Sequence, residues 1–395
     1  MNISWIKTKG RTFDPIQLKI AAQKKFNDNA KQDYFGAAPN VFIGRFGYPH
    51  ITVGILNTEE YARHDDPQHW VVANYSIPKI IDLRTQLINS TFKTSIKSFN
   101  DKLLELSQEV AMASKPVDVE ISLEKKPQFR LTTHQDATPH GPVVALKKVE
   151  VTENPKIPAK VDKLVDDVDL KAQEALVYLH NEGFDEQYLT KLITLGILGV
   201  KPQRKLVPTR WGITAVDDTL GKQYITEIKE YDKAPYQTYW GSYFGNYYLI
   251  LFFEDVWSYE LFETIVIEQA PFATDCESYS GRKTYADNTA GGYYAARIGI
   301  LEKLKEMKKQ ACVLTLRFID PTEYIAPLGV WVVREAVRKT MAITPLEFGN
   351  RELMMMYAKQ FVKKKFGVSL DPILRESVLL RQIKEQKKLS EFVKM

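Results

Sequence analysis

The chain has 395 residues, of which 44% are hydrophobic and 26% charged, so it is long enough for two or more domains and has an ordinary globular composition. Its formal net charge is +5, and residues 359–395 hold ten Lys and Arg against four Asp and Glu, which suits a polyanion or another acidic partner. The two cysteines, the absence of a long apolar run and the absence of a signal-peptide pattern argue against a zinc site and against a membrane protein. A cytoplasmic protein is expected.

Helical and strand-like patterns are mixed along the chain, which predicts an α+β fold. Segments with apolar residues at helical spacing, or bounded by capping residues and glycine, are expected to be helices. These are residues 17–31, 77–90, 95–114, 166–182, 185–195, 257–270, 288–310, 331–341, 351–366 and 371–385. Alternating or continuously apolar segments are expected to be strands. These are residues 41–43, 51–56, 117–123, 142–151, 211–216, 247–253 and 312–319.

The first two expected strands are joined by the loop GRFGYP, residues 44–49. Its two glycines permit a tight turn, which would present Arg45 and Tyr48 at its tip. A ligand-binding loop and a hairpin with an incidental arginine explain this pattern equally well.

The most informative stretch is RKLVPTRWGITAVDD, residues 204–218. Its basic, aromatic and acidic residues are Arg204, Lys205, Arg210, Trp211, Asp217 and Asp218. Arginine beside tryptophan can hold a phosphate and stack on a base. Two adjacent carboxylates can bind a divalent cation such as Mg²⁺ or Mn²⁺, or can orient the arginines. A salt-bridged loop is the alternative.

The helix expected at residues 288–310 has Gly291 and Gly292 in its first turns and Arg297 just after them. Glycines at a helix start let an anion approach the free backbone N–H groups, and Arg297 could add a second contact. Close helix packing would explain the glycines equally well.

Residues 386–393, QKKLSEFV, fit the core pattern of a peptide that binds the sliding clamp PCNA. Leu389 and Phe392 would lie on one side of a 3₁₀ turn and fill an apolar pocket. Gln386 would reach polar groups of the clamp, and the lysines would face its acidic surface. Val393 replaces the usual second aromatic residue, which would reduce affinity. The apolar face of a terminal helix is the alternative.

From about residue 12 to its end, the chain resembles the archaeal Nre family of DNA repair proteins. The resemblance is carried by VFIGRFGYP (41–49), RKLVPTRWGITAVDD (204–218), AGGYYAAR (290–297), GVWVVREAVR (329–338) and the clamp motif. It implies a role in DNA damage repair together with the replication clamp, without a known reaction. Many members also have an N-terminal cysteine-rich zinc element, but this chain has no cysteine before Cys276.

We therefore expect a large mixed N-terminal domain (12–270), a smaller mixed region (271–350), a basic helical tail (351–385) and the clamp peptide (386–393). The expected function is DNA repair near the nucleoid, with DNA or a nucleotide bound by four arginines and recruitment by PCNA. The four arginines are Arg45, Arg204, Arg210 and Arg297.

Three alternatives remain open. The first is a metal-dependent nuclease that uses Asp217 and Asp218 with Glu260 or Asp275. The second is an enzyme that handles a nucleotide or ADP-ribose through Arg210, Arg297 and the glycine-marked helix start. The third is a scaffold without a ligand.

Overall fold

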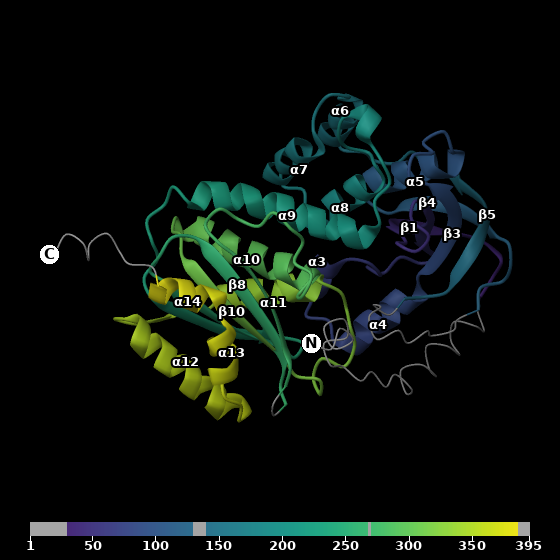
Figure 1. Cartoon of the computed structure of the whole chain (residues 1–395). Coiled ribbons are helices and arrows are strands. Elements are labelled where there is room, and N and C mark those ends of the chain that lie inside the picture. The colour runs from purple at the N-terminus through teal and green to yellow at the C-terminus, as the bar shows by residue number, and fades with distance from the viewer. Residues whose placement is uncertain (1–29, 129–139, 268–269, 386–395) are drawn as a thin grey trace. The chain divides into compact units, whose positions relative to one another are not determined.

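The computed structural model of the protein describes residues 30–128, 140–267 and 270–385 (Figure 1). Contacts divide these residues into two compact units. The first, here the barrel unit, ends at Leu220, and the second, the sheet unit, begins at Gly221. Each unit combines helices with a sheet, which confirms the α+β class. The helix expected at 17–31 lies almost entirely outside the described residues.

The barrel unit is organised around five strands that close on themselves in the order β1-β2-β3-β5-β4. Neighbouring strands are antiparallel, except β3 and β5, which are parallel. The strands are β1 (Asp33–Ile43), β2 (His50–Thr58), β3 (Ile88–Ser95), β4 (Val117–Leu123) and β5 (Val143–Val151). With helix α5 (Lys102–Met112) between β3 and β4, this is the strand order of the five-stranded Greek-key barrel called the OB-fold.

Strand alternation explains the core of the barrel. In β4, Val117, Val119, Ile121 and Leu123 are at most 1% exposed, and the residues between them reach solvent. A period of two places every second side chain on one face of a strand, so closing the sheet turns that face inward. Each buried aliphatic side chain contributes about 1.5–3 kcal/mol.

Short helices complete the barrel unit. They are α3 (Pro67–Val72), α4 (Ile77–Gln86), α6 (Ala159–Asp166), α7 (Ala172–Asn181), α8 (Glu186–Thr194), the 3₁₀ turn η1 (Lys201–Gln203) and the first part of α9 (Thr209–Ile228). The side chain of Asp185 accepts a hydrogen bond from the Tyr188 amide at 2.7 Å, which confirms the predicted cap of α8.

The sequence prediction missed the strand at residues 88–95. Helices were expected over 77–90 and 95–114, but α4 ends at Gln86 and β3 occupies Ile88–Ser95. This strand pairs with β2 on one side and β5 on the other, and such long-range pairing is not visible in local periodicity. Residues 166–182, expected as one helix, are divided between the end of α6 and α7.

Residues 211–216 were expected to form a strand but belong to α9. The Pro208 carbonyl accepts hydrogen bonds from the amides of Trp211 and Gly212 at 2.8 and 3.0 Å, so the helix starts directly after the proline, where proline is well tolerated. The β-branched residues of this segment favour a strand locally, but such propensity is a weak prior.

The sheet unit contains a six-stranded sheet in the order β11-β6-β7-β10-β8-β9, in which only the β8–β10 pair is parallel. The strands are β6 (Gln237–Tyr243), β7 (Asn246–Phe253), β8 (Ser258–Ile265), β9 (Phe272–Glu277), β10 (Cys312–Ile319) and β11 (Leu346–Glu347). The helix expected at 257–270 is also wrong, because β8 lies inside the sheet between β10 and β9. The strands expected at 247–253 and 312–319 are confirmed.

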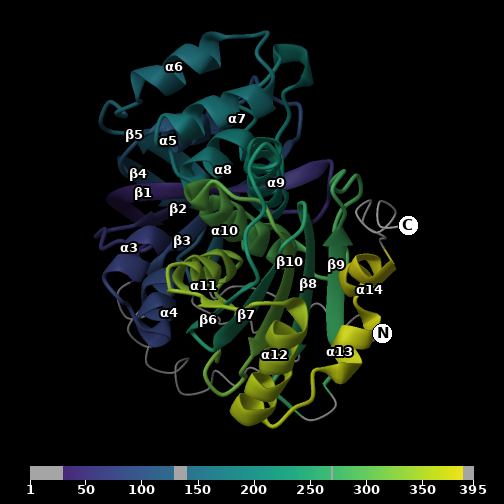
Figure 2. The ribbon, with the colours of Figure 1, turned by 90° about the vertical axis from the view of Figure 1, so that its left-hand side faces the viewer.

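Helices cover both faces of this sheet (Figure 2). They are α10 (Gly291–Met307) and α11 (Trp331–Met341) on one face, and α12 (Arg351–Phe366), α13 (Asp371–Glu376) and α14 (Val378–Glu385) on the other. Alternate residues of β7, among them Leu249 and Leu251, join residues of α12–α14 in one hydrophobic core. The basic C-terminal helices thus complete the sheet unit. Among the described residues, no helix is long and apolar enough to span a membrane.

Candidate nucleic-acid interface

The loop between β1 and β2 lies against the start of α9, so two stretches singled out in the sequence form one surface. The Ile43 amide donates a hydrogen bond to Thr209 Oγ1 at 2.8 Å, across 166 residues of sequence. Beside this bond, the rings of Tyr48 and Trp211 pack with centroids 5.3 Å apart. We call the exposed residues here the barrel-end surface. It consists of Arg45, Phe46, Tyr48, Arg210 and Trp211.

The aromatic side chains of the barrel-end surface are unusually accessible. Phe46 is 81% exposed, Tyr48 42% and Trp211 46%. Clustered exposed aromatic rings are uncommon on a monomeric protein and mark binding surfaces. Nucleic-acid bases are among the ligands that such rings hold, because every base presents a π-face.

Cations accompany these rings. The Arg45 guanidinium lies 5.3 Å from the centre of the Phe46 ring, and Arg210 precedes Trp211 in the first turn of α9. Lys205 is also exposed, three residues before Pro208. Within the described ranges, no carboxylate forms an ion pair with Arg45, Lys205 or Arg210. The surface therefore carries positive charge that is not neutralised by these parts of the chain.

Backbone contacts hold the loop in place. Gly47 has φ +82°, and a Cβ there would lie 2.6 Å from the carbonyl oxygen of His50, so this position requires glycine. The His50 amide donates to the Gly47 carbonyl at 2.8 Å, and the Ile96 amide donates to the Pro49 carbonyl at 3.1 Å. The tight turn expected from the sequence is present, and Tyr48 is presented from a fixed backbone.

Arg204 lies in the same stretch but has a structural role. Its Nε donates to the Gly199 carbonyl at 2.7 Å, and its Nη2 donates to the carbonyls of Val165 and Asp167, each at 3.0 Å. The guanidinium joins the end of α6 to the chain before η1. These bonds occupy three of the five N–H donors of the guanidinium, in contrast to the exposed Arg45 and Arg210.

Asp217 and Asp218 lie inside α9, not at the end of a strand. Asp217 is 1% exposed, and successive helical residues point about 100° apart, so the two carboxylates do not project side by side. In residues 30–128, 140–267 and 270–385, no group of three or more His, Cys, Asp and Glu is placed to hold a metal ion. Their metal-binding or orienting role stays a prediction.

Arg297 is 1% exposed inside the sheet unit. Its Nη1 donates to Glu277 Oε2 at 2.7 Å, and its guanidinium lies 5.5 Å from the centre of the Tyr293 ring. A Cβ on Gly292 would lie 2.7 Å from Glu263 Oε1, so this glycine permits close packing of α10 against the sheet. Gly291 precedes it in the same first turn. The convergence of Arg297 with the three arginines of the barrel unit stays a prediction.

Glu260 and Asp275, the two other carboxylates considered for a nuclease site, also have internal partners. Glu260 and Glu263 lie on a strand, where residues three apart face opposite sides. Glu260 accepts hydrogen bonds from Ser377 Oγ and from the amides of residues 378 and 379 at the start of α14. Asp275 accepts from the amide and hydroxyl of Thr289 and pairs with Arg282.

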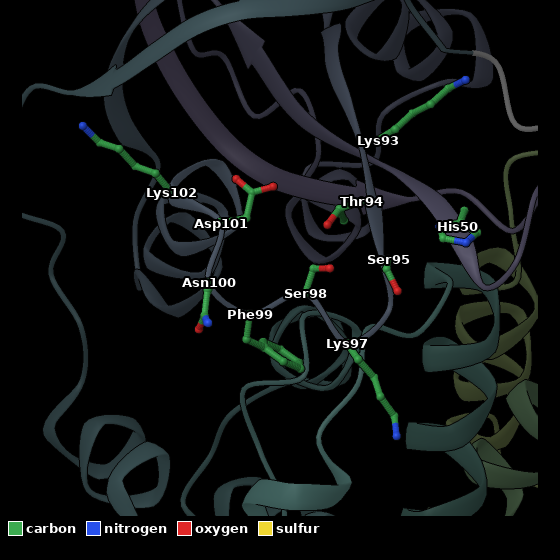
Figure 3. A pocket seen from close by; sticks show the side chains of 10 residues that line it. All are labelled: His50, Lys93, Thr94, Ser95, Lys97, Ser98, Phe99, Asn100, Asp101 and Lys102. Carbon is green, nitrogen blue, oxygen red and sulfur yellow. The ribbon is translucent and has the colours of Figure 1, made fainter.

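A pocket of about 990 Å³, which the sequence did not predict, lies next to the β1–β2 loop. Its walls come from the start of β2, the end of β3, the following loop and the first residue of α5 (Figure 3). Many of the lining side chains are basic or carry a hydroxyl group, and we call this cavity the lysine pocket. They include His50, Lys93, Ser95, Lys97, Ser98 and Lys102.

The lysine pocket was missed because residues 77–90 and 95–114 were assigned to two helices and no strand was expected between them. In that assignment Lys93 and His50 have no reason to be near each other, whereas in the barrel His50 is paired with Ser95. The signal was present in INSTFKTS, residues 88–95. Its hydroxyl and β-branched residues favour a strand over a helix.

Comparison with known proteins finds the same family along most of the chain. Residues 9–270 match the family model of the archaeal Nre N-terminal region, and residues 277–392 match that of the C-terminal region. Relatives include the DNA repair protein NreA of Haloferax volcanii, 36% identical over 80% of each chain. NreA of Archaeoglobus fulgidus is 38% identical over 83% of this chain and 84% of its own, and NreB of the same organism is 33% identical over 92% and 93%. No solved structure matches significantly.

Proposed function

Because the chain belongs to the archaeal Nre family, we propose that it is a DNA repair protein that binds DNA through the barrel-end surface and is recruited by PCNA. The names of its relatives support the repair role. DNA binding rests on one observation: the rings of Tyr48 and Trp211, from two distant stretches of the sequence, pack in a tilted arrangement 5.3 Å apart on an exposed surface. Arg45 and Arg210 lie in the same two stretches and form no ion pair with a carboxylate of the described residues.

The chemistry of this surface suits a nucleic acid. Stacking of a base on an aromatic side chain contributes about 1–3 kcal/mol. Arg45 and Arg210 can donate to phosphate oxygens in a bidentate geometry. Since the rings and the guanidinium groups lie on the same surface, one nucleic-acid strand can stack its bases on the rings while its phosphates contact the arginines.

The test is the affinity for a labelled oligonucleotide, measured by fluorescence anisotropy at fixed salt. Tyr48→Ala and Trp211→Ala should each raise the dissociation constant by roughly 5- to 150-fold, corresponding to about 1–3 kcal/mol. The matched control is Tyr178→Ala on α7, because Tyr178 is 41% exposed in the same unit. Equal affinities for the three variants and the parent chain would contradict DNA binding at this surface.

PCNA recruitment is supported by the motif and by what precedes it. The residues of the motif, Gln386, Leu389, Phe392 and Val393, lie outside the described residues. The preceding helix, α14, ends at Glu385 and is fixed to β8 through Glu260. A peptide that follows directly on an anchored helix can bind a partner without unfolding the domain that carries it.

The enzyme alternatives have weaker support. The nuclease would use Asp217, which is buried in α9, together with Glu260 or Asp275, both of which accept several internal hydrogen bonds. The nucleotide-handling enzyme would use Arg297, which is buried against Glu277. The exposed barrel-end surface needs no such rearrangement to meet a ligand.

A further inference from the structure

The barrel-end surface and the lysine pocket are neighbours in the barrel unit. Tyr48, Pro49 and His50 are consecutive, so the loop that carries the aromatic pair leads directly into the pocket wall. The Ile96 amide donates to the Pro49 carbonyl at 3.1 Å, and the Leu206 amide donates to the Ile96 carbonyl at 2.9 Å. These bonds tie together the β1–β2 loop, the β3–α5 loop and the chain that leads to α9.

We propose that the barrel-end surface and the lysine pocket together bind a single strand of DNA, with bases on Tyr48 and Trp211 and with backbone phosphates in the pocket. The inference rests on the proposed function and specifies its ligand. It adds a phosphate-binding site, formed chiefly by Lys93 and Lys97, that lies outside the stretches which carry the family resemblance.

The side chains of the pocket fit a phosphodiester backbone. Lys93, Lys97 and Lys102 lie on different sides of the opening with their ammonium groups directed outward, and Thr94, Ser98 and Asp101 lie between them (Figure 3). Lysine ammonium groups bind phosphates as point charges, and hydroxyl groups commonly donate to phosphate oxygens. The pocket therefore offers positive charge at its rim and neutral donors inside.

One carboxylate lies among these groups, and it has a partner. The Asp101 side chain accepts a hydrogen bond from the Leu103 amide at 2.9 Å and caps α5. Throughout the part of the chain that the structure describes, no carboxylate forms an ion pair with Lys93, Lys97 or Lys102. The positive charge of the three lysines is thus available to an anionic ligand.

Two observations favour a single strand over a duplex. The first is the aromatic pair, because the faces of paired bases are covered by their neighbours in a double helix and cannot stack on a protein side chain. The second is position. The loop between β1 and β2 and the face of β2 and β3 are where barrels with this strand order bind oligonucleotides, and His50, Lys93 and the Tyr48 loop occupy those places.

The experiment compares anisotropy titrations of the full chain with a labelled oligothymidylate of about 12 nucleotides and with a duplex of the same length. We expect at least tenfold tighter binding of the single strand. Lys93→Ala/Lys97→Ala should weaken that binding and reduce the slope of log K against log salt by about 1.4, because each lost phosphate contact removes about 0.7. Both lysines are exposed, so the thermal unfolding of the variant should match the parent.

The matched control is Lys115→Ala/Lys156→Ala. These exposed lysines belong to the same unit but lie beyond the far end of α5, where the Ser114 amide donates to the Lys156 carbonyl. The control should keep the affinity and most of the salt slope. A Lys93/Lys97 variant that behaves like this control would overturn the phosphate site, and duplex binding as tight as single-strand binding would overturn the choice of ligand.

The two levels of the hypothesis fail differently. If the parent chain binds neither oligonucleotide, the proposed function itself is wrong. If it binds DNA and loses affinity with Trp211→Ala but prefers the duplex, DNA binding stands and the single-strand inference falls. Tighter binding of an oligouridylate of the same length would replace DNA by RNA as the ligand and overturn the inference.

Discussion

At the scale of single residues, the four arginines that the sequence groups together have different surroundings. Arg45 and Arg210 are exposed, whereas Arg204 donates to three carbonyls and Arg297 is buried against Glu277. The sequence shows that each lies near glycine, proline or aromatic residues. It cannot show whether a guanidinium faces solvent, because that depends on chain segments far away in sequence, such as residues 165–167 for Arg204.

This contrast can be tested with the same conservative change at two positions. Arg204→Lys should lower the free energy of unfolding by about 1–3 kcal/mol, because an ammonium group cannot reproduce the fork that reaches three carbonyls. Arg45→Lys, on the exposed loop, should change it by less than about 0.5 kcal/mol. Denaturant unfolding measures both. DNA affinity should fall for Arg45→Lys and stay unchanged for Arg204→Lys, and the reverse pattern would assign Arg204 to the ligand site.

A second residue-scale prediction concerns Lys191 on α8. Burial lowers the pKa of Lys191 to about 8, and its ammonium group lies 4.9 Å from the centre of the Tyr188 ring. In the unfolded chain the pKa is near 10.4, so the unfolded state binds more protons between these values. The contribution of Lys191 to stability must therefore rise as the pH increases from about 8 to 10.

Lys191→Met keeps the apolar stem and removes the titration. The unfolding free energy of the parent minus that of Lys191→Met should increase with pH across this window, by at most about 1.4 kcal/mol per pH unit. Lys201→Met, on the exposed turn η1, serves as the control for general alkaline effects. A difference that is flat from pH 7 to 10 would show that Lys191 titrates normally.

At the scale of secondary-structure elements, the sequence predicted best those segments whose local pattern agrees with their tertiary setting. The buried strands β7 and β10 and the helices α10, α11 and α12 were all found near their observed bounds. The errors fall at β3, β8 and the start of α9, where pairing or packing with distant segments decides the conformation. Because β3 was not predicted, the lysine pocket that its end helps to form was not predicted either.

The contact between α14 and β8 gives a prediction at this scale. Glu260 is fully buried and accepts from Ser377 Oγ and from the amides of Val378 and Leu379 at 3.0 and 3.2 Å. Glu260→Ala would leave these donors without their acceptor and open a cavity. We expect a loss of about 2–4 kcal/mol in unfolding free energy.

Hydrogen exchange should place this loss at the C-terminal helices. In Glu260→Ala, protection should fall first for the amides of α14 and α13, whereas the strands of the barrel unit should keep theirs. Glu254→Ala, an exposed change shortly before β8, is the control. A uniform loss of protection over the whole chain would mean that Glu260 is not a local anchor.

At the scale of the whole molecule, the compact units and the family regions do not divide at the same place. The units meet at residues 220 and 221 within α9, whereas the two family models are separated near residues 270 and 277. Sequence similarity therefore follows the whole chain, and its N-terminal family region includes the barrel and the first strands of the sheet. The sequence alone could identify the family, but the barrel required knowledge of which strands pair.

The last prediction concerns recruitment by PCNA, which depends on residues that follow the anchored α14. Leu389 and Phe392 are the apolar anchors of the motif, and burying each would contribute about 1.5–3 kcal/mol. Leu389→Ala/Phe392→Ala should therefore weaken clamp binding at least a hundredfold at any salt concentration. Lys387→Ala/Lys388→Ala should weaken it mainly at low salt, because surface charges chiefly raise the association rate and are screened by ions. Calorimetry and surface-binding kinetics with purified PCNA measure both effects.

A chain that ends at Glu385 keeps all of α14, so its melting temperature should match the parent while clamp binding is lost. If the shortened and full chains bind PCNA equally, the motif is not the recruiting peptide, and the clamp, if bound at all, contacts a surface of the folded units.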